Sequence, residues 1–193
     1  MIRSNPPELC GAPFYDEPIT YLSLWNKFRA WEYNGWKPES MSWKTGCYIH
    51  AGLSDGQFNF TGPDVIPFFE SICVNNFQKF SIGSMKHAVS CLENGLIASH
   101  GILQRNGEEE LRYYAAPPWP IYHATRTKLR VKFETPRCYL FQVAGPTSLQ
   151  VLERATDESL ADIAFLRFRN AKIAGKNVEI GRIGMSGNLA YEI

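Results

Sequence analysis

The chain has 193 residues, a formal net charge of +1 and a hydrophobic fraction of 45%, a composition that suits one folded domain and excludes a disordered chain. Because positive and negative charges nearly balance, neither nucleic acid nor an anionic membrane is expected as the main partner. No apolar run approaches the roughly 18–20 residues that span a bilayer, and no apolar signal-peptide core follows Met1, so the sequence predicts a cytoplasmic protein.

The first 45 residues differ in character from the rest of the chain. They are rich in Trp, Tyr and Pro, with Trp25, Trp31 and Trp36 close together. We predict a loop-rich aromatic arm over residues 1–45, which contains one helix at Leu22–Tyr33 and packs on the remaining domain.

An internal repeat organises the rest of the sequence. Alternating apolar and polar positions lead to Gly-Pro in Phe58–Pro63 and again in Phe141–Pro146, which is typical of a half-buried strand that ends in a tight turn. Beyond each Gly-Pro the apolar spacing becomes helical, with Pro expected at the first helical position. A strand–Gly-Pro–helix junction is common, but the matching residues on both sides favour a duplication.

Further strands follow each predicted helix. After the first helix, Asn94-Gly95 and Asn106-Gly107 predict hairpin turns, and a short helix is expected from Pro117 to Ala124. After the second, a short acidic helix is expected at Asp157–Ile163. The predicted strands are His87–Cys91, Leu96–Leu103, Glu110–Ala115, Phe165–Phe168, Ala171–Ile173, Val178–Ile183 and Leu189–Ile193.

This order of elements predicts an α+β protein made of two duplicated, ferredoxin-like β-α-β halves with antiparallel sheets. We assign residues 46–140 to the first repeat and residues 141–193 to the second, which is incomplete because its closing helix is absent. An incomplete repeat leaves an open sheet edge, so a partner chain or self-association through that edge is expected.

Motifs for several common chemistries are absent from the sequence. It contains no phosphate-binding glycine loop and no nucleophile elbow. The four histidines have no spacing typical of a metal site, so no metal site is predicted. The five cysteines are scattered without a Cys-x-x-Cys pair, which favours reduced, core-filling thiols.

Two segments carry a resemblance to a known family. Tyr139–Pro146 with its following helix, and the closing Gly184–Ile193, resemble the folate-binding domain of the aminomethyltransferase family, which includes the glycine cleavage T-protein. Gly-Met-x-Gly at the start of the closing segment, Lys172–Gly175 and Tyr122-His123-Ala124 are closer to its tetrahydrofolate-dependent aryl O-demethylase branch, which acts on vanillate or syringate. The resemblance extends over residues 36–193 and corresponds to the N-terminal part of a full family member.

The resemblance implies tetrahydrofolate as the cofactor, with Glu192 accepting paired N–H bonds from the pterin ring. Such a bidentate, charge-assisted arrangement is strong, although a strand Glu by itself is more often an ordinary surface residue. Tyr191 and Met185 would stand beside Glu192 as walls of the cofactor site.

The sequence departs from the family pattern where catalysis is expected. Asn76 stands where the T-protein has an Asp close to the reacting nitrogen, so it cannot act as a base. His50–Leu53 replaces a stretch that normally holds an acidic residue and a histidine, and Ala116 stands where an Arg would engage a benzoate substrate. Asn76, His50 and Tyr122 therefore remain the candidate catalytic residues.

Two functions follow from these residues. The first is a tetrahydrofolate-dependent methyltransferase or O-demethylase that takes the methyl group of a small-molecule donor such as a methoxy-aromatic compound. The second is a non-catalytic folate-binding domain, or a half-domain that requires a partner chain. An unrelated α+β protein with chance similarity is a third, weaker alternative.

Overall fold

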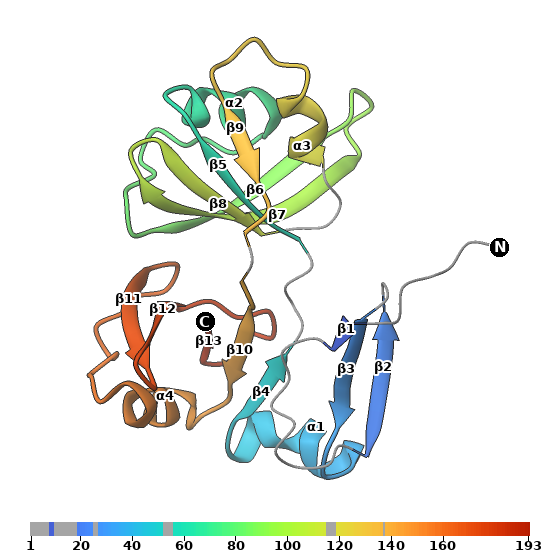
Figure 1. Ribbon diagram of the computed structural model, residues 1–193, viewed down its shortest axis with the longest axis vertical. Coiled ribbons are helices and arrows are strands. Elements are labelled where there is room, and N and C mark those ends of the chain that lie inside the picture. Colours follow the sequence, from blue (N-terminus) through green and yellow to red (C-terminus); the bar gives the residue numbers. More distant parts are fainter. Residues whose placement is uncertain (1–7, 10–18, 25–26, 52–55, 115–118, 137) are drawn as a thin grey trace, which may run out of the picture. The chain divides into compact units, whose positions relative to one another are not determined.

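The computed structural model describes residues 8–9, 19–24, 27–51, 56–114, 119–136 and 138–193. The chain divides into two compact units (Figure 1). The terminal unit contains residues 1–53, 139–163 and 170–193, and the central unit contains residues 54–138 and 164–169. None of the helices in the described ranges is long and apolar enough to cross a membrane.

The central unit is a five-stranded antiparallel sheet with two helices. Its strand order is β6-β7-β8-β5-β9. The strands are β5 (Gln57–Thr61), β6 (Met85–Cys91), β7 (Ile97–Gly107), β8 (Glu110–Tyr114) and β9 (Lys132–Glu134), and the helices are α2 (Val65–Ile72) and α3 (Trp119–Ala124). One face of the sheet packs Phe60 against Phe69 of α2, with ring centroids 5.0 Å apart.

The terminal unit contains a second five-stranded sheet, in the order β11-β12-β13-β10-β4, and a three-stranded sheet, β1-β3-β2. The larger sheet consists of β4 (Tyr48–Ala51), β10 (Phe141–Ala144), β11 (Phe168–Ile173), β12 (Lys176–Gly181) and β13 (Ala190–Glu192). The smaller consists of β1 (Glu8–Leu9), β2 (Thr20–Leu24) and β3 (Lys27–Glu32), and the helices are α1 (Trp36–Thr45) and α4 (Ser148–Thr156). Val143, Tyr191 and Leu152 of α4 pack together in its core.

The predicted α+β fold with antiparallel, duplicated halves is confirmed, and the repeat is visible in the pairing of strands. β5 lies between β8 and β9, and β10 lies between β13 and β4 in the corresponding positions. Gly62 and Gly145 follow these central strands with φ of 132° and 126°. A Cβ atom at Gly62 would overlap the carbonyl oxygen of Arg130, and one at Gly145 that of Gly46. Both glycines are therefore required by the same close approach of two chain segments.

The terminal unit completes its sheet with residues from early in the chain. Strand β4 pairs with β10, with Gln142 opposite His50, although residues 46–140 were expected to form the first repeat. The sheet of the terminal unit thus has five strands, and its edge strand β4 precedes the central unit in sequence. The last strand, β13, was expected to leave an open sheet edge, but it lies between β12 and β10. The proposed boundaries at 45 and 140 consequently differ from the contact-based units.

Two of the predicted helices are wrong. Within the predicted helix Leu22–Tyr33, residues 22–24 belong to β2 and residues 27–32 to β3, because polar and apolar residues alternate along Lys27–Ala30 with the period of a strand. Residues 25–26 lie outside the described residues. Residues 157–163 form turns and irregular structure after α4, which is capped by Asp157 with a left-handed φ of 54°. The carboxylate of Glu153 accepts the backbone N–H of Leu160 at 2.9 Å and fixes this turn.

Smaller differences occur at the ends of elements. The strand expected at Phe165–Phe168 begins only at Phe168. Pro63 and Pro146 lie in the turns that precede α2 and α4 rather than at their first helical residue. Ala115 to Pro118, which include ends of a predicted strand and helix, lie outside the described residues, as does Cys10.

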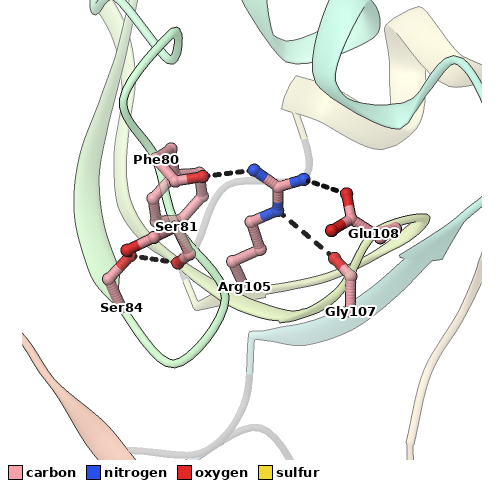
Figure 2. A network of polar contacts seen from close by, with 6 residues as sticks. All are labelled: Phe80, Ser81, Ser84, Arg105, Gly107 and Glu108. Carbon is pink, nitrogen blue, oxygen red and sulfur yellow. Dashed lines mark hydrogen bonds and ion pairs between the residues drawn. The ribbon is translucent and has the colours of Figure 1, made fainter.

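A partly buried cation, Arg105, connects the β7–β8 turn to the segment after α2 (Figure 2). Arg105 donates to the backbone oxygens of Phe80 and Gly107 and forms an ion pair with Glu108 at 2.9 Å. Its side chain is 16% exposed. Because every arm of the guanidinium is used, Arg105 has a structural role in the central unit.

Candidate functional site

A row of polar side chains crosses three neighbouring strands of the terminal unit. Gln142 on β10 lies opposite Glu192 on β13 and opposite His50 on β4. Residues that face one another across antiparallel strands project to the same side of the sheet. We call these three residues the Glu192 row. Tyr48, two positions before His50 on the same strand, shares this face.

The carboxyl group of Glu192 has no partner within the described part of the chain. It is partly buried, and neither a hydrogen bond nor an ion pair to it is found there. Burial raises the pKa of Glu192 to about 7, from an ordinary value of 4.5. A carboxylate that is desolvated without compensation is ready to accept N–H donors from a ligand.

Gln142 lies next to Glu192 and is also incompletely bonded. The residue is 4% exposed, and its Nε2 has no hydrogen-bond partner among the described residues. Its Oε1 accepts the hydroxyl of Tyr48 at 3.5 Å, a long and weak bond. Buried polar groups are nearly always satisfied, so this unused donor beside an unused acceptor marks the row as a candidate binding site.

The central unit has an equivalent row, whose side chains are hydrogen-bonded to one another. Asn59 on β5 lies opposite Arg112 on β8 and Glu134 on β9. Arg112 Nε donates to Asn59 Oδ1 at 3.0 Å, and Asn59 Nδ2 donates to Glu134 Oε1 at 3.4 Å. We call this set the Asn59 row. Because its members satisfy one another, it offers a ligand little that is unused.

The structure brings His50 together with Glu192 but places the other predicted catalytic residues in the central unit. Asn76 is exposed, and its Oδ1 accepts the backbone N–H of Gln78 at 2.8 Å. Tyr122 on α3 is 49% exposed and stacks on Trp119.

The two predicted wall residues occupy different surroundings. Tyr191 is 1% exposed and packs with Val143 and Leu152 on the face of the sheet opposite to that of Glu192. Its position supports a packing role. Met185 is 83% exposed and lies in the segment that joins β12 to β13.

Sequence reasoning missed Gln142 and Tyr48. Gln142 is the polar position of the alternating Phe-Gln-Val-Ala strand, and this alternation already places its side chain away from the core. Tyr48 could not be found this way, since the pairing of β4 with β10 joins segments far apart in the chain.

A contact between two histidines was also not predicted from their spacing in the sequence. His87 on β6 and His100 on β7 meet across the hairpin, with Nδ1 and Nε2 2.9 Å apart. Partial burial and the neighbouring His100 lower the pKa of His87. Across the described ranges, no group of three or more His, Cys, Asp or Glu side chains is arranged to hold a metal ion.

Comparison with known proteins identifies the family of this chain. The model of the GCVT N-terminal domain matches residues 14–193, so the chain belongs to this family. The sesamin methylene transferase of Sinomonas sp. is 41% identical over 167 residues, which represent 84% of this chain and 37% of that protein. The syringate O-demethylase of Sphingobium sp. is 27% identical over 177 residues, 84% of this chain and 38% of that protein.

Solved structures support the same fold. The glycine cleavage system aminomethyltransferase T of Bartonella henselae superimposes with a TM-score of 0.78 at 16% identity, over 90% of this chain and 48% of that one. The matched part of the chain therefore spans between 37% and 48% of the length of these three proteins.

Proposed function

We propose that this chain is the pterin-binding part of a tetrahydrofolate-dependent one-carbon transferase. The observation that carries the proposal is the partly buried carboxyl of Glu192 beside the Nε2 of Gln142, neither of which has a partner among the described residues. The adjacent N–H groups of a 2-aminopterin match the two oxygens of one carboxylate. These donors would stabilise the ionised form and compensate the desolvation that raises the pKa of Glu192.

The donor that we propose is a small aromatic compound whose one-carbon unit is bound to oxygen. The two relatives described above are named for methylene transfer from sesamin and for O-demethylation of syringate. In methyl transfer one C–O bond breaks and one bond from the carbon to a folate nitrogen forms, whereas transfer of a methylene group breaks two C–O bonds and forms two C–N bonds. Each folate nitrogen that gains a bond to carbon loses a proton, and each leaving oxygen takes one up. Tetrahydrofolate supplies the accepting nitrogen, and the protein supplies orientation and a proton.

His50 is the candidate in the Glu192 row for moving that proton. Its side chain is exposed at the edge of the sheet and projects to the same face as Gln142, and an imidazole can exchange a proton near neutral pH. Asn76 and Tyr122 remain candidate pocket residues. We retain the cytoplasm as the proposed location.

The alternative is a folate-binding module that does not catalyse transfer by itself. The amide of Asn76 favours this function, because its Oδ1 is already engaged by the N–H of Gln78 and it offers no carboxylate. The limited span relative to the relatives agrees with a need for further protein, either in the same polypeptide or from a partner chain.

Calorimetric titration of tetrahydrofolate into the 193-residue chain tests the proposal. We expect saturable binding that weakens by more than about tenfold in Glu192→Gln, which is roughly 1.4 kcal/mol. Glu110→Gln, a strand glutamate of the central unit, serves as the matched control and retains the affinity of the unmodified chain. Equal affinities for the unmodified chain and Glu192→Gln, or no binding to a folded chain, would contradict the proposed site.

A further inference from the structure

We infer that the Glu192 row selects a 4-oxopterin over a 4-aminopterin, with Gln142 reading the oxygen at position 4 and Tyr48 fixing the orientation of the Gln142 amide. This inference rests on the proposed function, because it assumes that a pterin lies against Glu192. It adds a specificity-determining residue and a positioning residue that the sequence did not single out.

The buried amide of Gln142 presents two groups to its surroundings. Its two ends are chemically different, since Oε1 accepts and Nε2 donates. Oε1 is engaged by the hydroxyl of Tyr48, whereas Nε2 has no partner among the described residues. The unused end of this buried amide is therefore a donor.

The neighbouring residue, Glu192, supplies hydrogen-bond acceptors rather than a donor. Glu192 lies directly across from Gln142 on the adjacent strand, a placement that holds the two Cβ atoms about 4.5–5.5 Å apart. Its carboxylate oxygens accept and have no partner in the described ranges. The row thus presents one donor beside a pair of acceptors on one face of the sheet.

The edge of a 4-oxopterin has the complementary order. It presents the carbonyl oxygen at position 4, then the N–H at position 3, then the amino group at position 2. A 4-amino ring places a donor where the oxygen was and, when unprotonated, a lone pair where the N–H was. It would set N–H against the Nε2 donor of Gln142 and a lone pair against Glu192, which leaves polar groups unpaired.

The hydroxyl of Tyr48 favours one of the two orientations of the Gln142 amide. If the amide turned over, Oε1 would lie beside the carboxylate of Glu192, and two acceptors would repel each other. The hydroxyl of Tyr48 donates to Oε1 and opposes this rotation. Tyr48 acts through Gln142 and is a positioning residue.

The test compares two ligands that differ only at position 4, tetrahydrofolate and its 4-amino-4-deoxy counterpart, by calorimetry with the 193-residue chain. We expect the unmodified chain to prefer tetrahydrofolate by about tenfold or more, because rejection leaves a buried donor unpaired. Gln142→Leu should bring the ratio of affinities close to one, and Tyr48→Phe should reduce it partly. Gln57→Leu is the matched control, since Gln57 is also 4% exposed with an unpartnered Nε2 but belongs to the central unit.

The outcomes separate this inference from the proposed function. Equal affinity of the unmodified chain for both ligands, combined with weaker binding of both by Glu192→Gln, would overturn the inference and leave the pterin site in place. An unchanged ratio in Gln142→Leu would also overturn it. Failure of the folded, unmodified chain to bind either ligand would overturn the proposed function and the inference together.

Discussion

In the central unit, the polar row across β5, β8 and β9 is closed by hydrogen bonds between its own members, whereas the corresponding row across β10, β13 and β4 is open. Asn59 joins Arg112 and Glu134, while Glu192 and the Nε2 of Gln142 remain unpartnered among the described residues. The backbone pairing is the same in both rows. Within this duplicated fold, the two rows therefore differ in whether their polar side chains are hydrogen-bonded to one another, and this difference distinguishes the structural row from the candidate site.

The largest expected effect concerns the backbone feature that the two repeats share. Gly145→Ala should lower the free energy of unfolding of the terminal unit by about 3 kcal/mol, because φ is positive and the new Cβ would overlap the carbonyl of Gly46. Gly175→Ala is the control in the same unit, with φ of 76° and no atom within 4 Å of the added Cβ. It should cost only about 1 kcal/mol. Denaturant titration measures both, and equal costs would refute the close approach.

The open row should give the terminal unit a characteristic pH dependence. The pKa of Glu192 is raised from 4.5 to about 7 by folding, so the folded state holds a proton that the unfolded state has lost. The free energy of unfolding should therefore fall by on the order of 2 kcal/mol as pH rises from about 4.5 to 7. Glu192→Gln should flatten this slope in denaturant titrations over that range.

The affinity for tetrahydrofolate should depend on pH in the opposite direction to the free energy of unfolding. A pterin that donates N–H bonds favours the ionised carboxylate, so its affinity should rise as pH increases through about 7, with release of a proton on binding. Calorimetry in buffers of different ionisation enthalpy measures that proton. Uptake of a proton, or a slope that survives in Glu192→Gln, would assign the effect to another group.

The smallest expected effect is a difference in stability between one variant of the Asn59 row and one variant of the Glu192 row. Asn59→Leu should cost about 1 kcal/mol of unfolding free energy, since it leaves Arg112 without one partner. Gln142→Leu should leave stability nearly unchanged, because it removes a donor that has no partner within the described residues and only one long hydrogen bond, from Tyr48. Thermal unfolding of the two variants measures the difference. A greater loss in Gln142→Leu than in Asn59→Leu would show that the Glu192 row is internally bonded.

Much of this fold could be predicted from local pattern. The strand–Gly-Pro–helix repeat predicted both central strands and both following helices. The spacing of apolar residues changes there from a period of two to a period of 3.6, and this change can be recognised from neighbouring residues alone. Glu192 was found through a resemblance, and a Glu in a strand would not have been chosen by pattern alone.

The remaining features depend on contacts between distant segments. The hairpin of β2 and β3 was predicted as a helix, since short apolar runs are ambiguous between the two periods. The pairing of β4 with β10, which places Tyr48 and His50 beside Gln142, joins residues almost a hundred positions apart. Local pattern also gave no reason to bring His87 to His100, because neither spacing nor periodicity specifies diagonal neighbours on two strands.

The assignment of the Glu192 row as the pterin site is tested most directly by nuclear magnetic resonance, with backbone amide shifts recorded while the chain is titrated with tetrahydrofolate. We predict shifts that saturate together at His50, Gln142 and Glu192, with Asn59, Arg112 and Glu134 unchanged. Saturable shifts at the Asn59 row without shifts at the Glu192 row would contradict the assignment of the open row as the pterin site.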